Sequence, residues 1–280
     1  MPEDVRTGLP VTSVLRLDRQ GSKLFATIDD PGTRNAMSDR LANDLEAVLD
    51  ATQADRTLRA LVLRGANGVF CAGADLAGAA EALKTEPATR DADPIWTQNR
   101  RGGALFARLN AHPQAVIAVV DGPAMGGGFG LLCCADVVLA GPGARFALSE
   151  TSLGLVPAQI APFVVARIGL PAARRLALTG ARLDARGAQA IGLADQALET
   201  PQALAGALDQ ALADIARCAP NANAATKRLL LRVAGVAGAD LEAFAGEAAD
   251  AFTAAIRGPE GREGLAAFAA KRAPNWAADA

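Results

Sequence analysis

Two glycine-containing segments carry the backbone chemistry that this sequence offers. The first is FCAGADL at 70–76, and the second is DGPAMGGGFG at 121–130, which leads into a stretch of small residues. Three successive glycines at a helix start leave N–H groups unpaired and expose the positive end of the helix dipole. Since no Gly-Lys-Ser/Thr ending and no suitably placed acid follow, the segment is neither a Walker loop nor a dinucleotide fingerprint. It favours an oxyanion site, whereas the first segment alone is explained equally well as a turn with Asp75 as a helix cap.

Acid–base chemistry in this chain falls to carboxylates. The one histidine, His112, is followed directly by a proline, so neither a histidine-based triad nor a multi-histidine metal centre can be assembled. We expect no metal site. The cysteine spacing fits neither a secreted disulfide framework nor a paired zinc site, and we expect buried, reduced thiols at Cys71, Cys133, Cys134 and Cys218.

Length and composition exclude several classes of protein. The chain has 280 residues, of which 51% are hydrophobic and 21% charged, so it can bury a large core and is neither disordered nor collagen-like. A net charge of −2 without a basic run makes nucleic acid a poor partner. Acids near the start and the lack of a long apolar stretch give no membrane segment or leader, so we expect a cytoplasmic protein.

Apolar runs alternate with helical segments in the first half of the chain. This alternation predicts an α/β protein, built as a spiral or a parallel sheet whose strands are buried on both faces. Ser38 is expected to cap a helix whose apolar residues share one face. The expected strands are 24–29, 58–64, 115–120, 137–140 and 146–148.

The pattern changes near Pro171, after which we expect helices and no further strands. One of these helices is expected to be capped by Asp240. We therefore predict a core domain at 1–170 that carries the site and a helical region at 171–280. Residues 77–101 show no decisive period and are expected to form a long connection or lid.

Four ordered motifs together resemble one known family. FCAGADL, DGPAMGGGFGLLCCAD, ARFALSE and LGLVPAQIAPFVVARIG are similar to segments of the crotonase superfamily, the enoyl-CoA hydratase/isomerase family. The resemblance implies a crotonase (ClpP-like) spiral of ββα units, with a C-terminal helical layer that forms trimers and often hexamers. It also implies an acyl-CoA thioester substrate. Coenzyme A is then part of the substrate, and no separate cofactor is expected.

Carried over residue by residue, the resemblance gives candidate functional positions. The two oxyanion-hole N–H groups belong to Ala74 and Gly127, which suits a thioester carbonyl that becomes enolate-like in the transition state. The residues implied in substrate binding are Arg34, Ala36, Asp75, Leu76, Gly130, Gln159 and Lys271. Among these, Arg34 and Ala36 match the segment that holds coenzyme A. Lys271 lies where relatives reach the coenzyme A of a neighbouring subunit, although it is equally explained as a solvated cation at a helix end.

The acid–base residues depart from the family pattern. Typical hydratases of the family use two glutamates; Glu150 matches the second, and Gly130 occupies the place of the first. A single carboxylate suits Δ3-Δ2 enoyl-CoA isomerases, and the missing glutamate also allows a catalytically idle interaction protein.

The segment PAQIAPFV instead resembles hydratases of 3-methylglutaconyl-CoA and isohexenylglutaconyl-CoA, so we expect hydration of a 3-branched glutaconyl-CoA. The candidate partners for its distal carboxylate are Gln159, Arg100 and Arg101. Burial is expected to raise the pKa of Glu150.

Overall fold

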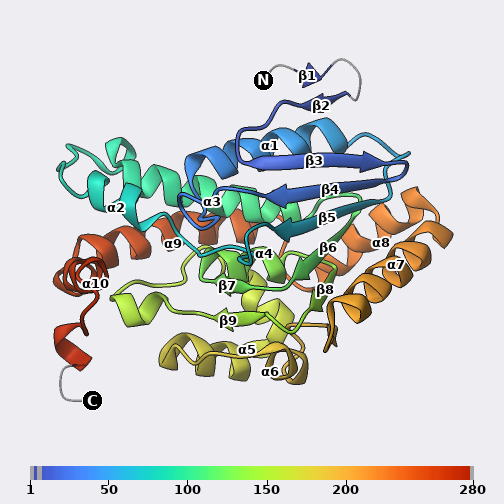
Figure 1. Cartoon of the computed structure of the whole chain (residues 1–280). Helices are drawn as coiled ribbons and strands as arrows, with labels where there is room; N and C mark the ends of the chain where they lie inside the picture. The colour runs from blue at the N-terminus through green and yellow to red at the C-terminus, as the bar shows by residue number, and fades with distance from the viewer. Residues whose placement is uncertain (1–2, 5–7, 278–280) are drawn as a thin grey trace.

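The computed structural model describes residues 3–4 and 8–277, and its centre is a six-stranded sheet (Figure 1). The strand order is β10-β8-β6-β5-β4-β3, with β3 and β4 antiparallel and the other neighbours parallel. The strands are β3 (Leu15–Gln20), β4 (Lys23–Ile28), β5 (Ala60–Gly65), β6 (Ala115–Val120), β8 (Val137–Ala140) and β10 (Gln196–Ala197). Two smaller sheets pair β1 (Glu3–Asp4) with β2 (Leu9–Pro10) and β7 (Pro123–Met125) with β9 (Arg145–Ala147).

The expected strands are present, and β6 and β8 have the predicted bounds. The expectation that no strand follows Pro171 is wrong, because β10 adds to the edge of the sheet in parallel with β8. A two-residue strand has no periodicity of its own to read. It is fixed by its neighbour, since the backbone N–H of Leu198 donates to the carbonyl of Ala140 at 2.8 Å.

Burial on both faces of the sheet explains why its strands read as continuous apolar runs. One face contributes to the main core together with α1 (Asp39–Thr52), α3 (Pro94–Asn110), α4 (Gly127–Cys133) and α5 (Ala161–Thr179). Helix α7 (Pro201–Arg217) covers the opposite face, where the packed side chains are Phe25, Ala60, Val62, Ile117, Leu139, Leu204 and Leu212. The Ser38 cap of α1 is confirmed, because its hydroxyl accepts the N–H of Leu41 at 3.3 Å.

The expectation that 77–101 is a connection or lid is wrong. This segment holds α2 (Leu76–Ala82), a short 3₁₀ helix (Arg90–Ala92) and the first turns of α3. Asp93 caps α3 by accepting the N–H of Ile95 at 2.9 Å, and its two carboxylate oxygens also pair with Arg257 at 2.7 and 2.8 Å. Because Arg257 is far away in the sequence, the start of α3 depends on a tertiary contact that local periodicity does not reveal.

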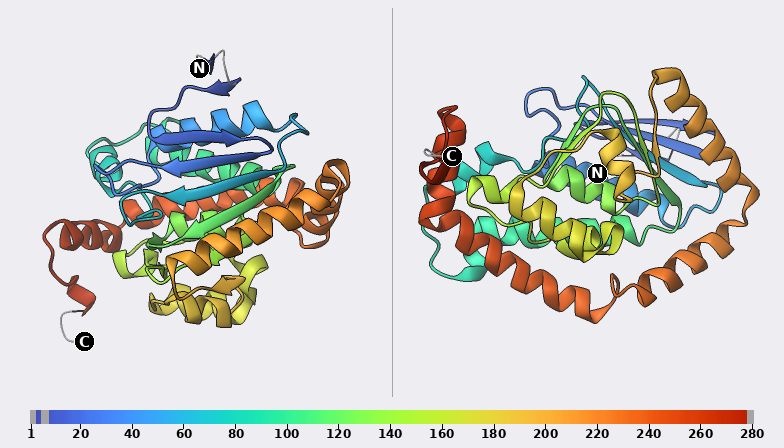
Figure 2. Two further views of the ribbon diagram at one scale, coloured as in Figure 1. Left: turned by 45° about the vertical axis from the view of Figure 1, so that its right-hand side comes forward. Right: turned by 90° about the horizontal axis from the view of Figure 1, so that it is seen from below.

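Helices dominate the second half of the chain. They are α6 (Ala185–Ala190), α7, α8 (Pro220–Val233), α9 (Ala239–Arg257) and α10 (Pro259–Ala269), and short 3₁₀ turns lie at Glu150–Leu153 and Asn275–Ala277. In the view from below, α8, α9 and α10 follow one another along the outer edge of the molecule (Figure 2). Helix α9 packs against α3. Its cap is Gly238, at φ 99°, and not Asp240, which lies in the first turn.

The predicted division at 170/171 falls inside α5. The helix is interrupted there by Gly169, whose φ is 72°, and Pro171 follows. The two-domain division stays a prediction. None of the helices in the described part of the chain is both long and apolar enough to cross a membrane.

Three of the four cysteines are buried as expected, but Cys218 is exposed, so the expectation for that thiol is wrong. The residue follows the last turn of α7, at its C-cap. Among the described residues, no group of three His, Cys, Asp or Glu side chains could hold a metal ion.

The single histidine is a buried structural residue. The Thr52 hydroxyl donates to the Val48 carbonyl at 2.6 Å, so it must accept from Nε2–H of His112, 3.2 Å away. The ammonium group of Lys227 on α8 donates to the carbonyls of His112 and Gln114, at 2.8 Å each. Burial, reinforced by nearby cations including Lys227, lowers the pKa of His112 to about 3. The imidazole is therefore neutral in the folded protein.

We predict that this buried imidazole makes a destabilising contribution to the fold in acid. Because the folded-state pKa lies below the ordinary value of 6.5, the unfolded chain binds the proton first as the pH falls. Relative to the variant His112→Gln, the wild type should lose about 1.4 kcal/mol of unfolding free energy per pH unit below pH 6.5. Urea unfolding of both proteins between pH 4.5 and pH 8 measures the difference. A difference that does not vary with pH would contradict the prediction.

Candidate active site

The two glycine-containing segments run side by side in parallel. Cys71 pairs with Ala124: its N–H donates to the Pro123 carbonyl at 3.1 Å, and its carbonyl accepts the N–H of Met125 at 3.0 Å. Three residues further along their segments, Ala74 and Gly127 directly follow Gly73 and Gly126. Both residues line a pocket of about 180 Å³. Within the described part of the chain, no hydrogen-bond acceptor takes the N–H of either residue.

The close approach of these segments depends on two glycines. Gly73 has φ 99°, and a Cβ on it would lie 2.9 Å from the carbonyl oxygen of Met125. Gly126 has φ 48°, and a Cβ there would lie 3.8 Å from the Cα of Gly73 and 3.0 Å from Oε1 of Glu150. A side chain at either position would be strained by the positive φ, and one at Gly73 would also push the two backbones apart.

A third segment braces the pair from the N-terminal side. Asn35 is buried; its Oδ1 accepts the N–H of Asp30 at 2.8 Å, and its Nδ2 donates to the carbonyls of Ala66 and Val69 at 3.2 and 2.8 Å. These hydrogen bonds fix the turn that leads to Met37, and the N–H of Met37 donates to the Gly73 carbonyl at 2.8 Å. Sequence reasoning missed Asn35, although an asparagine in left-handed conformation, here at φ 61°, is typical of such turns.

Three residues expected to bind coenzyme A lie outside the pocket wall. Ala36 is buried beside the brace, and Arg34 contributes its carbonyl to the N–H of Ala72 at 3.3 Å. Lys271 is exposed just after α10. Their roles toward coenzyme A stay predictions.

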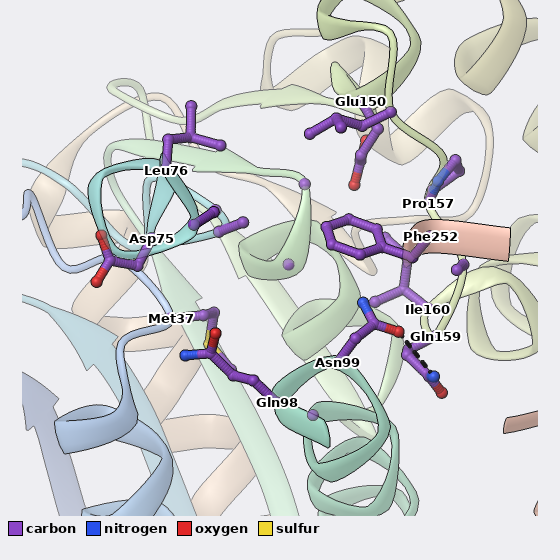
Figure 3. A pocket seen from close by; sticks show the side chains of 18 of the residues that line it. Met37, Asp75, Leu76, Gln98, Asn99, Glu150, Pro157, Gln159, Ile160 and Phe252 are labelled. Carbon is purple, nitrogen blue, oxygen red and sulfur yellow. Dashed lines mark hydrogen bonds between the residues drawn. The ribbon is translucent and has the colours of Figure 1, made fainter. Parts of the chain in front are cut away.

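Glu150 brings a carboxylate to the same pocket as the two free N–H groups. Its Oε2 is buried and has no hydrogen-bond partner among the described residues. Burial raises the pKa of Glu150 to about 7, in the direction expected, and one backbone hydrogen bond acts weakly against it. Figure 3 shows the carboxylate pointing into the pocket. A carboxyl group with such a pKa can both accept and donate a proton near neutral pH.

The structure does not place Gly130 on the pocket wall, contrary to its expected role in substrate binding. A Cβ on Gly130 would lie 2.3 Å from Cγ2 of Ile160 and 3.2 Å from Cε1 of Phe106. Apolar side chains therefore occupy the space where a first glutamate would start. The residue that decides this, Ile160, cannot be identified from the glycine segment itself.

The opposite pocket wall carries amides. Gln159 uses its Nε2 to donate to Oδ1 of Asn99 and to the carbonyl of Ala245, at 2.9 Å each. The Nδ2 of Asn99 is consequently turned into the pocket, on the side away from Gln159 (Figure 3). Gln98 also lines this wall, and sequence reasoning missed both Gln98 and Asn99 because they fall in the segment read as a connection.

The remaining candidate residues, Leu76, Asp75, Arg101 and Arg100, do not all line the pocket. Leu76 and Asp75 line the pocket, and Asp75 also caps α2, with Oδ1 accepting the N–H of Gly78 at 3.1 Å. Arg101 lines the pocket while paired with Glu46. Arg100 faces a different cavity, where its guanidinium is paired with Glu242.

Comparison with known proteins identifies the family. The family model for enoyl-CoA hydratase/isomerase matches residues 19–279. The chain belongs to the enoyl-CoA hydratase/isomerase family. It is 33% identical over 265 residues to 2,3-dehydroadipyl-CoA hydratase of Escherichia coli, an alignment that covers 94% of this chain and 98% of the relative.

Solved structures agree with the family assignment and show the crotonase fold. An enoyl-CoA hydratase/isomerase from Marinobacter aquaeolei is 47% identical with a TM-score of 0.76, covering 94% of this chain and 98% of its own. Pseudomonas aeruginosa AtuE is 48% identical with a TM-score of 0.75, covering 95% and 100%. Family membership makes this chain an enzyme of the enoyl-CoA hydratase type, acting on an acyl-CoA thioester.

We predict that Glu150→Gln abolishes turnover and leaves acyl-CoA binding intact. The amide has nearly the same shape but neither accepts nor supplies the proton, so kcat should fall at least about 100-fold. Steady-state kinetics and calorimetric titration with a saturated acyl-CoA measure the two effects. A variant that keeps most of its activity would remove Glu150 from the mechanism.

A second prediction concerns the missing glutamate. Gly130→Glu should lower the free energy of unfolding by about 2 kcal/mol or more, because the new side chain overlaps Ile160 and buries a carboxylate. Ile160→Gly removes the overlap at the cost of a cavity, so the loss in the double variant Gly130→Glu/Ile160→Gly should be smaller than the sum of the two single losses. Urea unfolding measures all three variants. If the single variant is as stable as wild type, the space beside Gly130 is not filled as described.

Proposed function

We propose that this enzyme adds water across the 2,3 double bond of a 3-branched glutaconyl-CoA, of the isohexenylglutaconyl or 3-methylglutaconyl type. The observation that carries the proposal is the arrangement of Glu150, with a pKa of about 7, beside the free N–H groups of Ala74 and Gly127 in one pocket.

The proposed mechanism uses Glu150 alone for proton transfer. The N–H groups of Ala74 and Gly127 donate to the thioester oxygen and stabilise the enolate that forms, each contributing about 3 kcal/mol to the transition state. The water oxygen bonds to C3 while ionised Glu150 takes one of its protons. Glu150 then returns that proton to C2, the enolate collapses to the thioester, and the carboxylate is regenerated. No cofactor is needed beyond the coenzyme A that the substrate carries.

Two observations support a substrate with a second carboxylate. The Nδ2 of Asn99 faces the pocket and is available to a distal carboxylate, whereas the Gln98 amide is engaged with Asp39 and the Arg101 guanidinium with Glu46. A relative at 33% identity acts on 2,3-dehydroadipyl-CoA, which is a thioester of a dicarboxylic acid. Gln159 would serve through Asn99, since its own amide donors are already engaged.

A Δ3-Δ2 enoyl-CoA isomerase is the second candidate. It is favoured by the apolar filling around Gly130, which leaves Glu150 without a second glutamate opposite it. In that reaction, Glu150 would take a proton from C2 and return it to C4. A catalytically idle interaction protein is disfavoured, because the free N–H groups and the unpartnered carboxylate are preserved together.

We also propose that the helical region mediates self-association into trimers or hexamers. Leu229, Leu230 and Val233 on α8 are exposed at 61%, 63% and 88%. Large apolar side chains grouped in this way are typical of protein–protein contacts.

Mass spectrometry in D₂O tests the proposal. Incubation with 3-methylglutaconyl-CoA or isohexenylglutaconyl-CoA should give addition of one water, with one carbon-bound deuterium at C2, and crotonyl-CoA serves as the unbranched comparison. Deuterium incorporation or double-bond migration in a 3-enoyl-CoA, without addition of water, would establish the isomerase instead. Because Glu150 acts first as a base, kcat/KM should rise with pH through about 7 and then level off. A fall over that range would contradict its role.

A further inference from the structure

A second cavity of about 270 Å³ lies directly behind the active-site pocket. It is formed between α3 and α9, and the ion pair of Arg100 with Glu242 spans these two helices at the cavity. Its wall is mainly apolar, with Ala104, Phe163 and Leu241 among the lining residues. Nothing in the reaction described above uses this space.

Gln159 is the residue that lines both cavities. Its side chain is buried and is held by Asn99 of α3 and the carbonyl of Ala245 on α9, at 2.9 Å each. Gln159 therefore forms a partition between the two cavities, and its unbranched side chain has several rotamers available.

Two adjacent glycines in α3 leave space beside the Gln159 side chain. A Cβ on Gly103 would lie 2.0 Å from Oε1 of Gln159, so Gln159 occupies its position only because this residue has no side chain. Gly102 lines the active-site pocket, and a Cβ there would meet nothing within 4 Å. Glycine inside a helix is unfavourable relative to alanine. Here the two glycines leave room on both sides of Gln159.

We propose that the second cavity is a binding site for the distal apolar part of the acyl chain, reached by displacement of Gln159. The inference rests on the proposed function in one respect, namely that the thioester binds beside Glu150 in the first pocket. The distal apolar part of the acyl chain would contact the Ala104, Leu241 and Phe163 side chains beyond Gln159. The charged groups of this cavity, Arg100 and Glu242, are paired with each other.

Binding of saturated acyl-CoA thioesters tests the proposal without requiring turnover. Dissociation constants of butyryl-CoA and decanoyl-CoA are measured by calorimetry. Each methylene that enters an apolar site strengthens binding by about fourfold, so wild type should bind decanoyl-CoA at least about tenfold more tightly than butyryl-CoA. Ala104→Phe fills the second cavity and should reduce this ratio to about threefold or less, whereas Gln159→Ala, which removes the partition, should increase it.

A matched control uses the same exchange elsewhere. Ala243 is exposed on α9 and lines neither cavity, so Ala243→Phe should keep the wild-type ratio. A wild-type ratio near one, or a ratio unchanged by Ala104→Phe, would overturn the second site while leaving the proposed hydration intact. If butyryl-CoA itself does not bind, the thioester site fails, and the second cavity loses its role with it.

Discussion

The close approach of two backbones at Gly73 and Gly126 is the constraint on which the rest of the site depends. The bridge between Cys71 and Ala124 holds the two segments together, and Ala74 and Gly127, which follow the two glycines, line the same pocket. Asn35 braces the pair through the turn that precedes α1. Glu150 then packs over Gly126, so one glycine both shapes the anion site and makes room for the carboxylate.

Local patterns were sufficient for the elements whose stability is local. Ser38 with its helix, and the buried strands β6 and β8, follow from capping and from apolar runs that need no knowledge of distant residues. Helix α3 was missed because its cap, Asp93, is stabilised by Arg257 of α9. The short strand β10 was missed for a similar reason, since its pairing with β8 is a tertiary contact.

In the candidate site, too, some residues could be predicted from local motifs and others could not. Glu150, Ala74 and Gly127 stand in motifs that resemble the family, and the structure brings these three residues to one pocket. The environment of Gly130 is set by Ile160 and Phe106, which come from other elements, and the direction of the Asn99 amide is set by Gln159. Such relations join residues far apart in the chain, so spacing alone does not disclose them.

Two buried titratable groups give the fold an unusual response to acid. The pKa of His112 lies below its ordinary value, so stability is lost as the pH falls from 6.5 toward 3. Glu150 acts in the opposite sense: its pKa is raised from 4.5 to about 7, so stability is gained as the pH falls over that interval. Between about pH 4.5 and 6.5 the two slopes have opposite signs and similar size. The imidazole buried beside Thr52 and the carboxylate in the pocket thus compensate one another, and these two groups together leave the stability of the fold nearly level across mildly acidic conditions.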